Sequence, residues 1–125
     1  MENDLARGTT KCHVYCLIKI FFGMCTYHIL IEREDIIIKW CSDCNTYNLT
    51  YGNLMMQFSE DAIAQFKCNL SDCYEYYLAH TVDWNNRNIF FNTRMDSMQL
   101  LFSLNEVSEL LSIIQEAELN QLAIL

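Results

Sequence analysis

Residues 48–70, NLTYGNLMMQFSEDAIAQFKCNL, predict a β-hairpin followed directly by an α-helix. Gly52 and Asn53 tolerate positive φ and separate two short runs with strand-like character, as a tight hairpin turn requires. Ser59 is a good helix N-cap, and the two acidic residues that follow it suit the positive end of a helix dipole. Apolar residues then recur at helical spacing. The stretch therefore predicts a β-β-α unit over residues 48–72.

The same order of elements recurs at residues 88–118, where Ser103 is the predicted N-cap and Glu106 completes a capping box. A shift of 44 residues places apolar residues on apolar residues: Phe58 on Phe102, Phe66 on Leu110, and Leu70 on Ile114. The first strands align at a shift of 40, so we expect a second hairpin loop that is four residues longer. We interpret the pattern as an internal duplication; the alternative is two unrelated units with a generic pattern.

Neither unit can bury its apolar face alone. We therefore expect an α+β fold, with a single antiparallel sheet and two helices on one of its faces. The 125 residues suit one domain, which we place at residues 25–125, after an atypical extension over residues 1–24.

Composition excludes some classes of protein. An apolar fraction of 52% is too high for a disordered chain, and a net charge of −8 argues against nucleic-acid binding, although it can hide a local basic patch. The longest apolar stretch, residues 14–24, contains Lys19 and is too short to span a membrane. We expect a cytoplasmic protein with no nucleic-acid or membrane partner; a secretory signal or lipid anchor is the alternative.

Two pairs of metal-binding residue types flank a predicted hairpin. Cys25-x2-His28 stands at its start and Cys41-x2-Cys44 at its end. Because a hairpin returns the chain to its origin, the four side chains are expected to meet in a closed tetrahedral site for structural Zn²⁺. Residues 25–47 would then form a zinc-ribbon-like hairpin. The alternatives are reduced cysteines packed as small apolar side chains with His28 in solvent, or a redox pair at Cys41 and Cys44.

Aromatic and acidic residues gather between the two units, at residues 69–87. Tyr77, His80 and Trp84 are candidate ligand-binding residues there. The alternative is that these aromatic side chains pack against the edge of the sheet.

The second predicted helix and its tail, through Leu125, are more apolar than one buried stripe requires. Either the tail folds back on its own core, or it forms a surface for a partner. The simplest partner is a second copy, giving a homodimer through Leu111, Ile114, Leu122 and Leu125.

A Cys-x2-Cys pair at Cys41 and Cys44 is followed by LTYGN at 49–53 and FSED at 58–61. This succession resembles an uncharacterised family of small Bacteroidetes proteins, over roughly residues 25–125. That family has no established activity, so the resemblance implies the architecture and the cysteine pair but no biochemical task.

Catalytic signatures are missing from the sequence, which has no Gly-x-Ser-x-Gly, phosphate-binding loop or dinucleotide fingerprint. We therefore expect a non-enzymatic interaction or adaptor module with a structural metal site. The alternative is a small-molecule-binding or catalytic protein that uses the aromatic region around His80 and Trp84.

Overall fold

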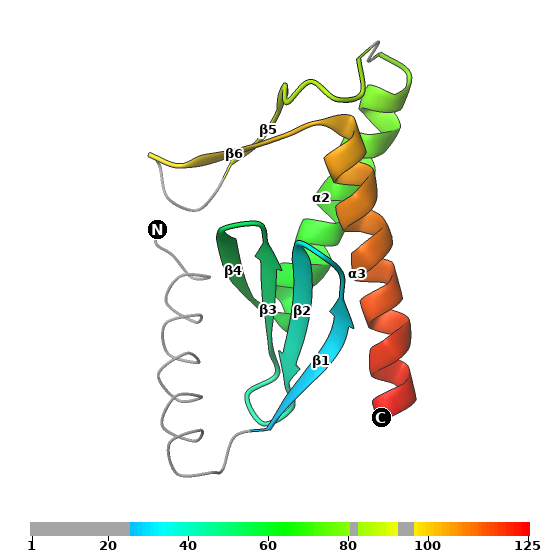
Figure 1. Cartoon of the computed structure of the whole chain (residues 1–125). Coiled ribbons are helices and arrows are strands. Elements are labelled where there is room, and N and C mark those ends of the chain that lie inside the picture. Colours follow the sequence, from blue (N-terminus) through cyan, green and yellow to red (C-terminus); the bar gives the residue numbers. More distant parts are fainter. Residues whose placement is uncertain (1–25, 81–82, 93–96) are drawn as a thin grey trace.

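The computed structural model describes residues 26–80, 83–92 and 97–125, so the predicted extension over residues 1–24, and Cys25, lie outside the described residues. Six strands and two helices make up the described fold, and the α+β class is confirmed (Figure 1). In chain order the elements are β1 (Tyr27–Glu32), β2 (Ile36–Cys41), β3 (Thr46–Tyr51), β4 (Leu54–Ser59), α2 (Glu60–Leu78), β5 (Ile89–Asn92), β6 (Gln99–Phe102) and α3 (Leu104–Ile124).

Strands β1 to β4 form an antiparallel meander in chain order. Trp40 lies opposite Tyr47, and Tyr47 lies opposite Phe58, so one row of aromatic side chains crosses three strands. Alternation along β2 and β3 turns one face toward the helices, as the period of a strand dictates. In β1 the register shifts between Ile29 and Ile31, and this bulge lets two neighbouring residues, Leu30 and Ile31, both be buried.

Strands β5 and β6 form a separate two-stranded ribbon, so the single sheet that we expected is in fact two sheets. The connection through α2 explains the difference. A helix of 19 residues spans roughly 28 Å. Since β4 ends where α2 begins, the chain enters β5 from the opposite end of α2 (Figure 1). The ribbon meets the first sheet through side chains and not through strand pairing: the rings of Tyr51 and Phe102 have centroids 6.3 Å apart.

Strand pairing also corrects the alignment of the two units. Tyr47 lies opposite Phe58, and Ile89 lies opposite Phe102. With Phe58 equivalent to Phe102, the first strands are equivalent at a shift of 42 rather than 40. The expected difference in loop length is confirmed, because six residues separate β5 from β6 and two separate β3 from β4. A slip of two residues keeps every side chain on its face, so the apolar pattern cannot distinguish the two alignments.

Both predicted N-caps are confirmed. The Ser59 hydroxyl accepts a hydrogen bond from the backbone N–H of Ala62, and the Ser103 hydroxyl accepts one from that of Glu106. The Glu106 carboxylate in turn accepts from the backbone N–H of Ser103 and from the Arg87 guanidinium. Burial alone would raise the pKa of Glu106, but these hydrogen bonds and the charge of Arg87 outweigh it and lower that pKa.

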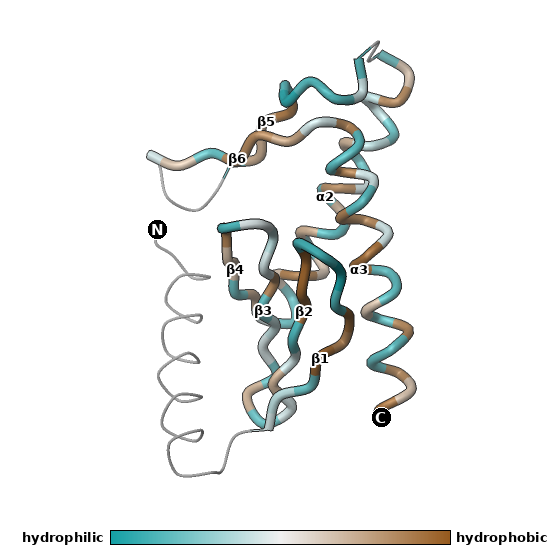
Figure 2. The backbone as a smooth tube through the Cα atoms, viewed as in Figure 1, coloured by the Kyte–Doolittle hydropathy of each residue, from teal (hydrophilic) through white to brown (hydrophobic). Residues whose placement is uncertain are grey.

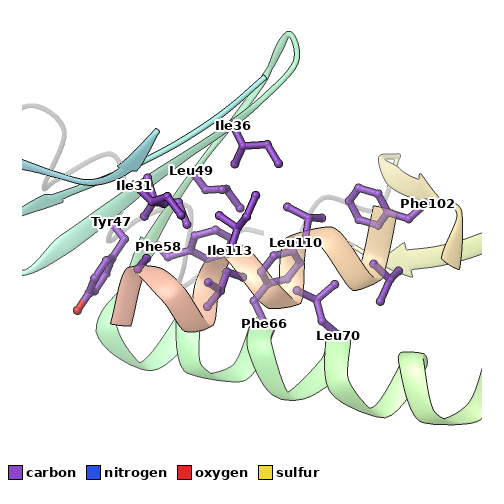
Figure 3. Close-up of a cluster of buried hydrophobic side chains, with 14 of the residues drawn as sticks. Ile31, Ile36, Tyr47, Leu49, Phe58, Phe66, Leu70, Phe102, Leu110 and Ile113 are labelled. Atoms are coloured by element: carbon purple, nitrogen blue, oxygen red, sulfur yellow. The ribbon is translucent and has the colours of Figure 1, made fainter. Parts of the chain in front are cut away.

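One cluster of buried side chains joins both sheets to both helices (Figure 3). The two helices run antiparallel on the same side of the four-stranded sheet (Figure 1). Phe66 of α2 stacks on Phe58 at a ring-centroid distance of 5.1 Å and meets Phe91 edge-on at 6.0 Å. Phe91 contacts Phe102 at 5.4 Å. This aromatic chain connects the four-stranded sheet to the ribbon, so the two sheets share a core.

Candidate functional site

A cavity of about 490 Å³ lies where the N-terminal end of α2 and the C-terminal end of α3 meet the sheet. We call it the sheet–helix cavity. Leu30 and Ile38 contribute from the sheet, Ile63 and Ala64 from α2, and Ile114 from α3. The volume is within the range of roughly 300–1,000 Å³ that small-molecule sites occupy.

Polar groups gather at one side of the sheet–helix cavity. The buried Tyr47 hydroxyl donates to Gln121 Oε1 at 3.1 Å, and Tyr47 points toward the end of α3 (Figure 3). Glu60 and Glu118 also line the cavity. Burial, chiefly, raises the pKa of Tyr47; the hydrogen bond to Gln121 opposes this rise, and the negative charges of the two glutamates add to it. The Tyr47 hydroxyl therefore lies in a negative electrostatic environment.

The last turns of α3 carry large apolar side chains that are 44–79% exposed. We call Leu119, Leu122, Ile124 and Leu125 the C-terminal apolar strip (Figure 2). No charged side chain occurs in residues 119–125. Hydrogen bonds hold this end of the helix on the sheet, from Tyr47 to Gln121 and from the Asn120 amide to the Leu30 carbonyl at 2.6 Å. The strip is thus presented by an anchored helix.

The four residues that we expected at a dimer interface differ in their exposure to solvent. Ile114 is buried in its own core, and Leu111 is partly buried against that core. Leu122 and Leu125 are exposed and belong to the C-terminal apolar strip. A partner could therefore contact the strip, but not Ile114.

Cys41 and Cys44 lie in one tight turn. Cys41 ends β2 and is fully buried, and the turn closes with a hydrogen bond from the Asn45 N–H to the Cys41 carbonyl at 2.7 Å. Thr26 is bound to the same turn: its N–H donates to Asp43 Oδ2 at 2.8 Å, and its carbonyl accepts from the Ser42 N–H at 3.2 Å. The residue that follows Cys25 is therefore held against the Cys41–Cys44 turn.

His28 has a different environment from Cys41. It lies opposite Trp40, and the two rings stack with centroids 5.3 Å apart. Since consecutive residues of a strand point to opposite faces, the His28 side chain shares the face of Trp40, whereas Cys41 points to the other face. Within residues 26–80, 83–92 and 97–125, no three His, Cys, Asp or Glu side chains form a group that could hold a metal ion. The four-ligand zinc site requires Cys25 and stays a prediction.

The aromatic candidates lie at the C-terminal end of α2. His80 stacks on Tyr76 with ring centroids 4.5 Å apart, and its Nδ1 is 2.6 Å from the Tyr76 carbonyl oxygen. Tyr77 packs against the core, and the Trp84 carbonyl accepts from the Asn105 N–H at 3.1 Å. Neither the sheet–helix cavity nor a second cavity beside Glu116 is lined by His80, Tyr77 or Trp84. The ligand role of the three residues stays a prediction.

The polar residues of the sheet–helix cavity were missed by the sequence analysis. The position of Tyr47 could have been predicted. It lies two residues before Leu49 in the same strand, so both side chains face the core. The positions of Gln121 and Glu118 could not, since only the packing of α3 against β3 and α2 brings them to the cavity.

A family model described as "Family of unknown function (DUF6686)" matches residues 24–125. The chain belongs to this family. No curated protein and no solved structure matches the chain significantly. Among the described residues, no helix is both long enough and apolar enough to cross a bilayer.

Proposed function

We propose that this protein is a non-enzymatic interaction module that forms a homodimer through the C-terminal apolar strip. The exposure of Leu122 and Leu125 on an anchored helix carries the proposal. Contiguous exposed apolar surface of this kind is typical of protein–protein contacts.

The charge distribution favours a second copy as the partner. The chain carries a net charge of −8, so two copies repel one another over most of their surfaces. Residues 119–125 contribute no charged side chain, so the strip itself adds nothing to this repulsion. A two-fold axis beside the strip would place each strip against its equivalent, which gives a closed dimer and not an open chain.

Sedimentation equilibrium over a range of protein concentrations tests the dimer. We expect the wild-type chain to convert from monomer to dimer, and Leu122→Ser to weaken dimerisation by about 100-fold or more, since each of the two copies loses a buried leucine worth roughly 1.5–3 kcal/mol. Met55→Ser is the matched control, because Met55 is also more than half exposed but lies on β4. A monomeric wild type, or a Leu122→Ser variant that dimerises as wild type does, would contradict the proposal.

We further propose a structural Zn²⁺ site formed by Cys25, His28, Cys41 and Cys44. The two hydrogen bonds of Thr26 support it, because they tie the neighbour of Cys25 to the Cys41–Cys44 turn. Coordination by all four ligands would require the start of β1 to rearrange, because the His28 ring lies on the face of Trp40 and the Cys41 side chain on the other face. Zinc would then stabilise the β1–β2 hairpin, whose first strand is the edge of the four-stranded sheet.

Elemental analysis of protein purified under reducing conditions tests the zinc site. We expect one zinc per chain in the wild type and in Cys68→Ser, a control on the exposed face of α2, and none in Cys44→Ser. Because His28 stacks on Trp40, zinc addition should also change the fluorescence of Trp40. Zinc-free wild-type protein, or full zinc content in Cys44→Ser, would exclude the site.

We propose that the family consists of small Bacteroidetes proteins that share the Cys-x2-Cys pair. We also propose a cytoplasmic location, which suits a chain of seven cysteines, because an odd and frequent set is typical of a reducing compartment.

A further inference from the structure

We propose that the sheet–helix cavity binds a small molecule with an apolar body and a cationic head group. The cavity provides both parts of such a site. Its walls are apolar where β1, β2, α2 and α3 meet, and its polar groups lie together on one side.

The walls favour a small molecule over a peptide. Leu30 and Ile38 contribute from the sheet, Ile63 from α2, and Ile114 from α3, so the sheet and both helices of one chain form the wall. The volume of about 490 Å³ is within the range of small-molecule sites. No part of this wall has to come from a second copy, but Leu122 and Leu125 line the cavity and also belong to the C-terminal apolar strip.

The charges favour a cationic head group. Glu60 and Glu118 both line the cavity. Lys67 Nζ lies 2.7 Å from Glu118 Oε1 and neutralises part of that charge. Glu60 accepts a hydrogen bond from the neutral Asn45 amide at 3.1 Å, and no lysine, arginine or histidine of the described residues forms an ion pair with it. A ligand cation would therefore find, beside an apolar cavity, a carboxylate whose charge is offset only by the N-terminal end of the α2 dipole.

The neutral polar groups add a second anchor. The Tyr47 hydroxyl donates its proton to Gln121 Oε1, which leaves the hydroxyl oxygen as an acceptor. An ammonium group beside Glu60 could donate to that oxygen as well. An anionic head group would meet two carboxylates in the same place and would be repelled.

Isothermal titration calorimetry of the full chain with three probes of equal chain length tests the proposal. The probes are n-octylammonium, n-octanol and n-nonanoate, which carry the same octyl chain and differ only in the head group. We expect n-octylammonium to bind about tenfold more tightly than n-nonanoate, with n-octanol between them. Absence of binding by n-octylammonium, or equal affinities for it and n-nonanoate, would overturn the proposal.

Two variants locate the binding. Ala64→Trp places a large side chain in the cavity and should abolish binding of n-octylammonium, whereas Ala79→Trp adds the same bulk at the exposed end of α2 and should not. Circular dichroism checks that both fold. Glu60→Gln keeps an acceptor for Asn45 and should lower the affinity for n-octylammonium several-fold without changing that for n-octanol. Binding that persists in Ala64→Trp, or unchanged head-group preference in Glu60→Gln, would also overturn it.

Leu122 and Leu125 lie both at the cavity and in the C-terminal apolar strip, so the oligomeric state is measured on the same samples. Sedimentation with and without n-octylammonium separates loss of dimerisation from loss of ligand binding. Head-group selectivity in a monomeric sample would support the cavity proposal even if the dimer proposal fails.

Discussion

The two β-β-α units have the same local design but different surroundings. In each unit a serine caps the helix through the backbone N–H three residues later. Equivalent positions are buried in both: Phe58 and Phe102, Phe66 and Leu110, Leu70 and Ile114. Yet β3 pairs with β2 and extends a four-stranded sheet, whereas within the described part of the chain β5 and β6 pair only with each other.

Their outer faces show the consequence. On the ribbon, Phe90 and Leu101 lie directly opposite one another and are 62% and 47% exposed. In the first unit, the cross-strand pair Asn48 and Gln57 on the outer face is polar. The hairpin–helix pattern thus determines the fold of each unit. Whether the hairpin joins a larger sheet depends on whether another strand lies beside it.

Leu110→Ala is expected to have the largest effect on stability. Leu110 is fully buried where α3 contacts the shared core, so removal of its side chain leaves a cavity and should lower the free energy of unfolding by about 2–5 kcal/mol. Leu101→Ala removes the same atoms from an exposed position of the ribbon and should cost less than about 1 kcal/mol. Urea unfolding measures both; equal losses would contradict a core shared by the two units.

Removal of the two helix caps should have a smaller effect that differs between the units. Ser103→Ala should cost about 1–2 kcal/mol, because Ser103 is buried and its loss also disturbs Glu106. Ser59→Ala, at an exposed cap, should cost about 0.5–1 kcal/mol. Ser112→Ala, at an exposed interior position of α3, is the control and should be neutral or slightly stabilising in thermal melts. The reverse order of the two caps would show that burial does not strengthen the cap of the second unit.

Acid should remove the stabilising contribution of the Glu106 carboxylate in the capping box of the second unit. The pKa of Glu106 is lower in the folded protein than its ordinary value, so the carboxylate stabilises the fold above the unfolded-state pKa and this stability is lost as pH falls through the folded-state pKa. The stability advantage of wild type over Glu106→Gln should therefore be largest near neutral pH and disappear in acid. Urea unfolding at several pH values measures it, and an advantage that grows toward acid would contradict the sign.

The smallest effect is expected for the ion pair between Arg33, which follows β1, and Glu116 on α3. Arg33 Nη2 lies 2.6 Å from Glu116 Oε1, but both side chains are largely exposed. A double-mutant cycle with Arg33→Ala and Glu116→Ala should give a coupling free energy below about 1 kcal/mol that declines with salt. A larger, salt-independent coupling would mean that this contact fixes α3 on the sheet.

Much of the fold could be predicted from residues whose role is local. Gly52, with φ of 61°, and the caps Ser59 and Ser103 act within a few positions of themselves, and all three were assigned correctly. The register of β5 could not be assigned, because a slip of two residues preserves the faces of Ile89 and Phe91. The division into two sheets depends on the length of α2 and on tertiary packing, which the hairpin patterns do not encode.

The candidate sites were predictable to different degrees. The turn that holds Cys41 and Cys44 follows from sequence spacing, and the structure adds the contacts of Thr26 with it. The stacking of His28 on Trp40 depends on the pairing of β1 with β2 and was not anticipated. The sheet–helix cavity was not anticipated either, since Tyr47 and Gln121 are brought together only by the tertiary fold.

The proposed dimer is tested most directly by methyl NMR of the full chain over a range of protein concentrations. Each chain has a mass of 14.8 kDa, so a dimer remains well suited to such spectra. Self-association through the C-terminal apolar strip predicts that the methyl resonances of Leu119, Leu122 and Leu125 shift together as concentration rises, while those of Leu101, which is also exposed, stay in place. Resonances of the strip that do not change with concentration, or changes confined to the β5–β6 ribbon, would contradict it.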